Sequence, residues 1–246
     1  MKEFSKNNYA ILSKAGPKHE VNQDSVVAYF DEHKPLGFII VCDGVGGYPG
    51  GEIASQITTA HFYKAFLNKD VSLNWETWFL DTLKTVKVEL QAYVVKRPDL
   101  KEMATTLCLT VVDGEELHVF NLGDSMAYVY NKASRETLTV PQNLYNYLKR
   151  TGKSMSNLNV DARQMASLVN YVSADSPKKI WFDYKVHPLK PEEIVVVCSD
   201  GVYKFIDLSY YDLFKLNPVE MCEKIISLAV LNETNDDASV GVWYRG

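Results

Sequence analysis

Acidic residues stand beside glycine at three points where a short apolar run ends. The segments FIIVCDGVGG, VFNLGDS and IVVVCSDG carry Asp43, Asp124 and Asp200. Two further acidic sites adjoin apolar runs, because Asp24 in NQD precedes one and the NDD segment at 235–237 precedes another. The end of a strand places a carboxylate at the rim of a sheet, and a neighbouring glycine lets the backbone approach a ligand closely. These five sites are therefore candidates for one shared binding site.

Carboxylates that gather at one rim repel one another unless a cation lies between them. Sites built only from oxygen ligands favour hard ions such as Mg²⁺ and Mn²⁺ over zinc. A single Asp-Gly pair more often marks a turn than a ligand, and each segment alone could be one. Five such sites at the edges of expected strands predict a shared metal site.

Other catalytic chemistries lack their residues. No cysteine has arginine six positions later, so the loop of phosphocysteine phosphatases is absent, and the histidines and cysteines form no HxxxH or CxxC pair typical of zinc sites. The serine in Gly123–Ala127 precedes an expected strand, whereas a serine-hydrolase elbow precedes a helix. The loop after Asp43 has Pro49 where a dinucleotide fingerprint needs its third glycine.

Hydrophobic periodicity indicates the elements that must position the carboxylates. Strands are expected at 9–12, 25–30, 37–42, 104–112, 117–122, 126–130, 136–140, 181–186, 194–199 and 238–244, and helices at 53–65, 75–93 and 218–231. An Asp-Gly turn at 113–114 joins two of these strands into a hairpin. Blocks of consecutive strands with paired helices inserted predict an α+β fold with antiparallel sheets rather than a parallel βαβ arrangement.

Composition excludes several classes of protein. The chain has 246 residues, 46% of them hydrophobic, and a formal net charge of −5, which is typical of one globular domain or two small ones. An acidic chain lacks the excess positive charge that binds nucleic acid or an anionic membrane. No apolar run approaches the roughly 20 residues of a membrane span. No apolar signal core opens the sequence, and the four cysteines favour buried free thiols in a reducing compartment. We expect a cytoplasmic protein.

Six segments in order resemble the metal-dependent protein phosphatases of the PPM family, type 2C, in their compact bacterial form. The segments are GPKHEVNQD (16–24), VCDGVGGYPGGEIAS (41–55), MATTL (103–107), NLGDSMAYVY (121–130), VVVCSDGV (195–202) and NDDASV (235–240). The resemblance implies a single domain over 1–246 with a four-layer αββα sandwich, in which helix pairs flank two antiparallel sheets. A flap region at about 144–178 matches the family poorly.

The resemblance also implies the ligands of a two-metal centre. Asp43 is expected to bridge two Mn²⁺ or Mg²⁺ ions, and the carbonyl of Gly44 is expected to complete the second. Asp200 and Asp236 are expected to hold the first ion.

Two more carboxylates are assigned supporting roles by the same resemblance. Asp24 is expected to orient metal-bound waters, and Asp124 is expected to help hold a third, weaker ion. Two divalent ions that share a water lower its pKa, so the resulting hydroxide can attack phosphorus in line without a protein nucleophile.

The chain departs from the family pattern at three places. The pattern G-x-x-R-x-x-N has its phosphate-binding arginine where this chain has His19, which offers no bidentate guanidinium. The arginine that usually follows GDS is Met126, and the family stretch L-T-x-D-H-S is L-T-V-P-Q-N at 138–143. We therefore expect His19 to bind phosphate in a weaker or more specialised way.

These observations predict a Mg²⁺/Mn²⁺-dependent protein phosphatase that hydrolyses phosphoserine and phosphothreonine. Its partner is expected to be a phosphorylated protein, the target of a serine/threonine kinase, and not nucleic acid or a membrane. Two alternatives stay open: a pseudophosphatase that binds a partner through the same fold, and a small-molecule phosphohydrolase.

Overall fold

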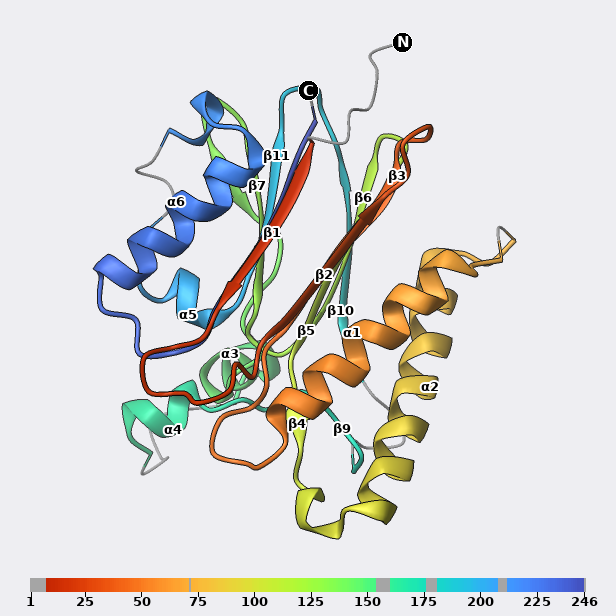
Figure 1. Cartoon of the computed structure of the whole chain (residues 1–246), viewed down its shortest axis with the longest axis vertical. Coiled ribbons are helices and arrows are strands. Elements are labelled where there is room, and N and C mark those ends of the chain that lie inside the picture. Colours follow the sequence, from red (N-terminus) through yellow and green to blue (C-terminus); the bar gives the residue numbers. More distant parts are fainter. Residues whose placement is uncertain (1–7, 71, 154–159, 176–180, 208–211, 246) are drawn as a thin grey trace.

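The computed structural model describes residues 8–70, 72–153, 160–175, 181–207 and 212–245. Two five-stranded antiparallel sheets pack face to face (Figure 1). The first sheet has the order β1 (Tyr9–Lys14), β12 (Ala238–Tyr244), β11 (Ile194–Cys198), β7 (Met126–Tyr130) and β8 (Arg135–Thr137). The second has the order β10 (Asp183–Pro188), β6 (Glu116–Leu122), β5 (Leu107–Asp113), β3 (Leu36–Cys42) and β2 (Ser25–Phe30). A short pair joins β4 (Ala104–Thr105) to β9 (Val172–Ser173).

Helices cover the outer faces of both sheets, which gives four layers (Figure 1). The second sheet is covered by α1 (Gly51–Leu67) and α2 (Trp75–Lys96), and the first by α5 (Asp200–Tyr203) and α6 (Pro218–Leu231). Two more helices, α3 (Leu144–Thr151) and α4 (Ala162–Ala166), lie at the lower end of the sandwich in Figure 1. Short 3₁₀ helices occupy Pro98–Leu100 and Leu213–Lys215. The expected αββα sandwich is confirmed.

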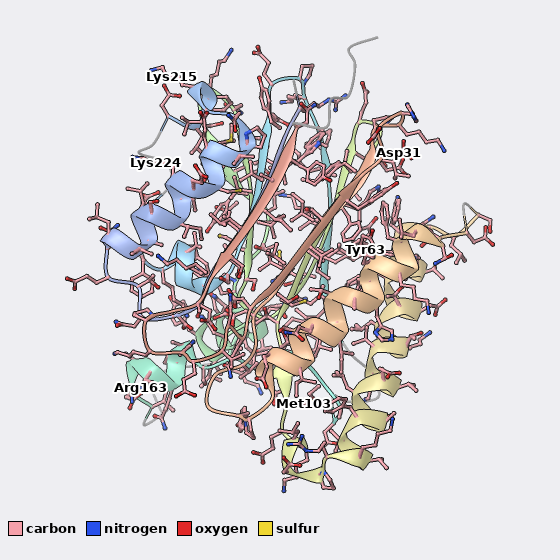
Figure 2. The ribbon with its side chains drawn as sticks, in the orientation of Figure 1. Asp31, Tyr63, Met103, Arg163, Lys215 and Lys224 are labelled. Atoms are coloured by element: carbon pink, nitrogen blue, oxygen red, sulfur yellow. The ribbon has the colours of Figure 1, made fainter. Side chains whose placement is uncertain are left out.

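Three layers of apolar side chains hold these elements together, and Figure 2 shows side chains filling the spaces between them. The strand β3 contributes to two of the layers because its side chains alternate between its faces. Phe38 and Ile40 pack toward α1 and α2, whereas Ile39 and Val41 pack toward the other sheet. This is why the β3 segment reads as a continuous apolar run.

Local signals set the ends of the longer helices. The Asn74 side chain accepts a hydrogen bond from the backbone N–H of Thr77 at the start of α2. At the start of α6, Asn217 and Glu220 form a reciprocal capping box and Pro218 occupies the first turn. These caps satisfy backbone N–H groups that no helical carbonyl can reach.

Strand register brings together the strand ends that carry the candidate site residues. Ser25 at the start of β2 pairs with Cys42 at the end of β3. Cys198 at the end of β11 pairs with Met126 at the start of β7 and with Val240 near the start of β12. The residues just outside these strand ends therefore meet at the lower end of the sandwich in Figure 1.

The structure differs from the predicted elements mainly at strand boundaries. The strand expected at 104–112 is interrupted at Thr106, whose backbone N–H donates to the carbonyl of Asp43 rather than to a strand partner. The strands expected at 136–140 and 181–186 are Arg135–Thr137 and Asp183–Pro188. These shifts arise because sheet pairing, rather than local periodicity, decides where a short strand ends.

Two further expectations concern the state of the cysteines and the presence of membrane-spanning helices. Cys42, Cys108, Cys198 and Cys222 are all buried free thiols, as the sequence predicts. Among the helices of the described residues, none combines the length and the hydropathy needed to cross a membrane.

Gly241 allows the two sheets to approach closely, and this predicts a local effect on stability. A Cβ at position 241 of β12 would collide with Cγ2 of Ile39 on the facing sheet. We expect Gly241→Ala to lower the free energy of unfolding by about 1–3 kcal/mol because the core there is already full. Urea denaturation measures this change.

Gly46→Ala is the matched control, because a Cβ at Gly46 would meet no heavy atom within 4 Å. It should change the free energy of unfolding by less than about 1 kcal/mol. Equal effects of the two substitutions would contradict the close approach at Gly241.

Candidate metal centre

The Asp43 backbone is held by two threonines of the MATTL segment. Its N–H donates to Thr106 Oγ1 at 3.0 Å, and its carbonyl accepts from the Thr106 N–H at 2.8 Å and from Thr105 Oγ1 at 2.9 Å. Thr106 Oγ1 lies 2.7 Å from Ser125 Oγ, which ties this turn to the segment that carries Asp124. These bonds fix the Asp43 backbone at the end of β3. The segment was part of the sequence resemblance, but no role was predicted for either threonine.

The Asp43 carboxyl is surrounded by other carboxyls. Burial raises its pKa well above the usual range, and the charges of Asp24 and Asp200 raise it further. Asp124 and Asp236 act in the same direction. The site residues predicted from sequence are thus brought together around one group.

Gly44 occupies a position where no side chain fits. Its N–H donates to the carbonyl of Gln23 at 3.1 Å. A Cβ there would lie 2.6 Å from the carbonyl carbon of Gly51 and 2.8 Å from the Gln23 oxygen. The close approach of three backbone segments therefore requires glycine and holds the Gly44 peptide beside Asp43.

Two adjacent aspartates of the NDD segment have different surroundings. Asp237 is buried, and its two carboxylate oxygens accept hydrogen bonds of 2.7 Å from the backbone N–H groups of Gly16 and Gln23. Asp236 is partly exposed, and burial together with the charge of Asp200 raises its pKa. Asp237 therefore anchors the 16–23 loop, and Asp236 is the one that joins the carboxylate cluster.

Asp24 carries an unpartnered buried oxygen. Its Oδ2 accepts a hydrogen bond of 2.7 Å from Ser199 Oγ, which in turn accepts from the Ser239 N–H at 3.0 Å. Its Oδ1 is buried and has no hydrogen-bond partner among the described residues. Burial raises the pKa of Asp24 to about 7, although the Ser199 and Ser239 bonds oppose the shift. A buried polar oxygen without a partner is costly, so this atom suits a ligand or an ordered water.

The ammonium of Lys204, which sequence reasoning missed, lies near both Asp124 and Asp200. Burial raises the pKa of Asp124 to about 6, the charge of Asp200 adds to the shift, and Lys204 opposes it. Lys204 Nζ lies 2.6 Å from Asp200 Oδ2 and 3.5 Å from Asp124 Oδ2. The spacing of four residues from Asp200 to Lys204 is the signal that could have indicated the first contact.

His19 lies at the margin of the cluster. Its Nδ1 is 3.0 Å from Asp237 Oδ1, and 33% of its side chain is exposed. Interaction with the Asp237 carboxylate raises the pKa of His19, which favours the charged imidazolium near neutral pH. Donor atoms of His19, Asp236 and Asp237 all lie within 4.8 Å of one another.

The donor set fits hard divalent cations. The cluster offers several carboxylates and a buried oxygen without a partner among the described residues. Like charges at short range disfavour one another without a counter-ion. Oxygen ligands of this kind suit Mn²⁺ and Mg²⁺. Fold and site together define a β-sandwich protein with a candidate divalent-metal centre at one end of the sandwich.

A family model for protein phosphatase 2C matches residues 16–225. The chain belongs to this family, which confirms the resemblance inferred from its motifs. It is a phosphoprotein phosphatase of the 2C type.

Individual relatives agree with this assignment. A Mycoplasma pneumoniae chain named as a candidate protein phosphatase is 29% identical over 98% of this chain and 97% of its own length. The serine/threonine phosphatase stp of Listeria innocua is 26% identical over 72% of this chain and 71% of its own length.

Solved structures share the fold. Serine/threonine phosphatase Stp1 of Staphylococcus aureus superposes with a TM-score of 0.83 at 22% identity, covering 99% of this chain and 97% of that one. The catalytic domain of the phosphatase PstP, in complex with two manganese ions, has a TM-score of 0.76 at 20% identity, covering 97% of this chain and 98% of that one.

The crowded carboxylates predict an unusual pH dependence of stability in the metal-free protein. The folded-state pKa values of Asp24 and Asp124 are raised to about 7 and about 6, above the value of about 4 for an unfolded chain. The folded state therefore binds more protons than the unfolded state in this window, so stability falls as pH rises. In EDTA, we expect the free energy of unfolding to drop by about 3 kcal/mol from pH 5 to pH 7.5.

Urea denaturation at the two pH values measures this drop. Saturating Mn²⁺ at pH 7.5 should restore the lost stability, and Asp24→Asn should make the slope in EDTA shallower. A metal-free protein that is equally stable at both pH values would contradict the repulsion among these carboxylates.

Proposed function

We propose that Asp43, Gly44, Asp200 and Asp236 hold the two divalent ions with which this enzyme hydrolyses phosphoserine and phosphothreonine in proteins. One observation carries the assignment: carboxylates from separate strand ends converge on Asp43 closely enough to raise its pKa. Asp43 is central to the cluster and is the proposed bridging ligand. Asp200 and Asp236 would help hold the first ion, and the Gly44 carbonyl would help hold the second.

Asp24 is proposed to orient the attacking water. When bound, the divalent ions supply an activated water and neutralise the charge that develops on the phosphoryl group. Asp24 is held by Ser199 and keeps one buried oxygen free to accept a hydrogen bond from the attacking water. Its fixed orientation would direct that water toward phosphorus.

His19 is the proposed phosphate-binding residue. Asp237 holds the ring at 3.0 Å and favours its charged form, which can attract a phosphate oxygen. The same loop is tied to Asp237 through the backbone of Gly16 and Gln23. A single imidazolium binds phosphate less firmly than a guanidinium fork, because it presents one donor to the ligand.

We propose that residues 1–246 form a single phosphatase domain and that the flap at about 144–178 borders the substrate. Part of this flap, 154–159 and 176–178, lies outside the described residues. Gln142 links the start of the flap to the cluster, because its side-chain oxygen accepts from the N–H of Gly123, next to Asp124. A cavity of about 540 Å³ lies between residues 138–142 and α3, and its lining includes Tyr147 and Arg150.

The proposed partner is a phosphorylated protein that a serine/threonine kinase modifies. The relatives that carry the names of serine/threonine phosphatases support this class of substrate. We propose that the protein acts in the cytoplasm and that neither nucleic acid nor a membrane is its partner. The net charge of −5 supports that proposal because both surfaces are anionic.

Metal dependence and two substitutions test the function. We expect turnover of a phosphoserine peptide to require Mn²⁺ or Mg²⁺ and to stop in excess EDTA. Asp43→Asn and Asp200→Asn each remove a ligand charge and should lower kcat by about 100-fold or more at saturating metal. Steady-state phosphate release measures kcat.

Asp99→Asn is the control, because Asp99 is exposed and pairs only locally with Arg97. Either ligand variant that keeps more than a tenth of the wild-type kcat would overturn the role of that residue. A protein that binds a phosphopeptide without turning it over would be a pseudophosphatase, and preference for nucleotides over phosphopeptides would indicate a small-molecule phosphohydrolase.

His19→Arg tests phosphate binding. A guanidinium stays charged at every physiological pH, whereas the imidazolium is lost as pH rises. We therefore expect the variant to show a lower KM and a flatter alkaline limb of kcat/KM, with little change in kcat. Phosphopeptide kinetics between pH 6 and pH 9 measure both effects.

His33→Arg makes the same exchange on an exposed turn and should leave KM unchanged. Identical KM values for wild type and His19→Arg across the whole pH range would exclude His19 from phosphate binding.

A further inference from the structure

The Lys204 ammonium lies between two carboxylates of the metal centre. Its Nζ is 2.6 Å from Asp200 Oδ2 and 3.5 Å from Asp124 Oδ2. The Asp124 side chain is only 8% exposed, whereas 45% of the Lys204 side chain reaches solvent. The lysine thus extends from the surface with its charged end at the buried carboxylate.

The backbone of α5 fixes this arrangement. The Lys204 N–H donates to the carbonyl of Asp200 at 3.1 Å, so both residues lie on one face of the same turn. Val202 is buried in the apolar cluster beneath α6, and Gly201 packs against the carbonyl of Asp237 so closely that no Cβ fits. The turn cannot shift without disturbing these contacts.

Two divalent ions would not balance all the negative charge of the cluster, so one further positive charge is needed. The charges of Asp24, Asp124, Asp200 and Asp236 all act on the Asp43 carboxyl, which makes a group of five carboxyls, and the nearby Asp237 is paired with His19. Two divalent ions would offset four of the five negative charges, and one ammonium would offset the fifth. A third divalent ion beside Asp124 would have to displace the ammonium and would leave the site with excess positive charge.

We propose that the Lys204 ammonium takes the place of a third divalent cation between Asp124 and Asp200, so that this enzyme holds two metal ions and excludes a third. The inference rests on the proposed two-metal centre and concerns a residue outside its ligand set. It differs from the expectation that Asp124 helps bind a third ion, because the side chain that such an ion would need is already paired. Lys204 is thus a specificity-determining residue for metal stoichiometry.

Counting bound ions tests the proposal independently of activity. The full chain is dialysed to equilibrium against increasing Mn²⁺, and bound Mn²⁺ per chain is measured by elemental analysis, with free Mn²⁺ followed by electron paramagnetic resonance. We expect wild type to saturate at two ions. Lys204→Met removes the charge at similar length and should bind a third, weakest ion, whereas Lys204→Arg should stay at two.

Two controls identify the site of the extra ion. Lys84→Met breaks a comparable Lys–Asp pair on α2, with Asp81, and should stay at two ions. Adding Asp124→Asn to Lys204→Met should return the count from three to two, because the third ion loses a carboxylate. Circular dichroism verifies that each variant is folded, and Lys204→Gln serves as a second neutral variant.

The outcomes distinguish the role of Lys204 from the proposed two-metal centre. Wild type that binds three ions, or folded Lys204→Met and Lys204→Gln that both stop at two, would overturn the role of Lys204. Wild type that binds fewer than two ions would instead overturn the proposed metal centre. The wild-type count alone can contradict the proposal, so the test does not depend on any variant folding.

Discussion

Mutual repulsion among carboxylates at one end of the sandwich is the constraint on which the rest of the structure depends. Asp43 is surrounded by other aspartates, and its pKa rises because neither burial nor those neighbours favour its charge. Such a cluster is stable in its ionised form only when cations are bound. Two hydrogen bonds resist the repulsion: the Asp43 N–H donates to Thr106 Oγ1 and fixes that backbone, and Ser199 Oγ donates to the Asp24 side chain. The repulsion lowers the stability of the metal-free protein, and bound cations would remove it.

Asp237 shows how the same end of the molecule separates structural from chemical carboxylates. Both of its oxygens accept backbone hydrogen bonds from the 16–23 loop, and the pairing brings His19 to the edge of the centre. Its neighbour Asp236 keeps its carboxyl close to Asp200. One residue therefore holds the 16–23 loop, while the next is available to the proposed metal centre. In the proposed role of His19, Asp237 would favour the positive charge that phosphate binding needs.

Lys204 adds a fixed positive charge to a site that otherwise depends on exchangeable ones. A divalent ion binds according to its concentration, whereas an ammonium on α5 is present at every metal concentration. The elements that hold it, α5 and the first sheet, share one cluster of buried apolar side chains. Metal stoichiometry would then be a property of this chain's own residues rather than of the family fold.

Much of the fold and of the site is determined by the sequence itself. Alternating and continuous apolar runs define the strands, capping residues define α2 and α6, and the Asp-Gly segments mark strand ends, because each of these signals acts over a few neighbouring residues. The tertiary structure alone decided other features. It separated the surroundings of Asp236 and Asp237, which adjoin in sequence, because their neighbours come from α5 and the 16–23 loop. It also interrupted the strand at Thr106 and brought Lys204 to Asp124, 80 positions away. Such contacts depend on which distant segments fold together, and no local pattern encodes that choice.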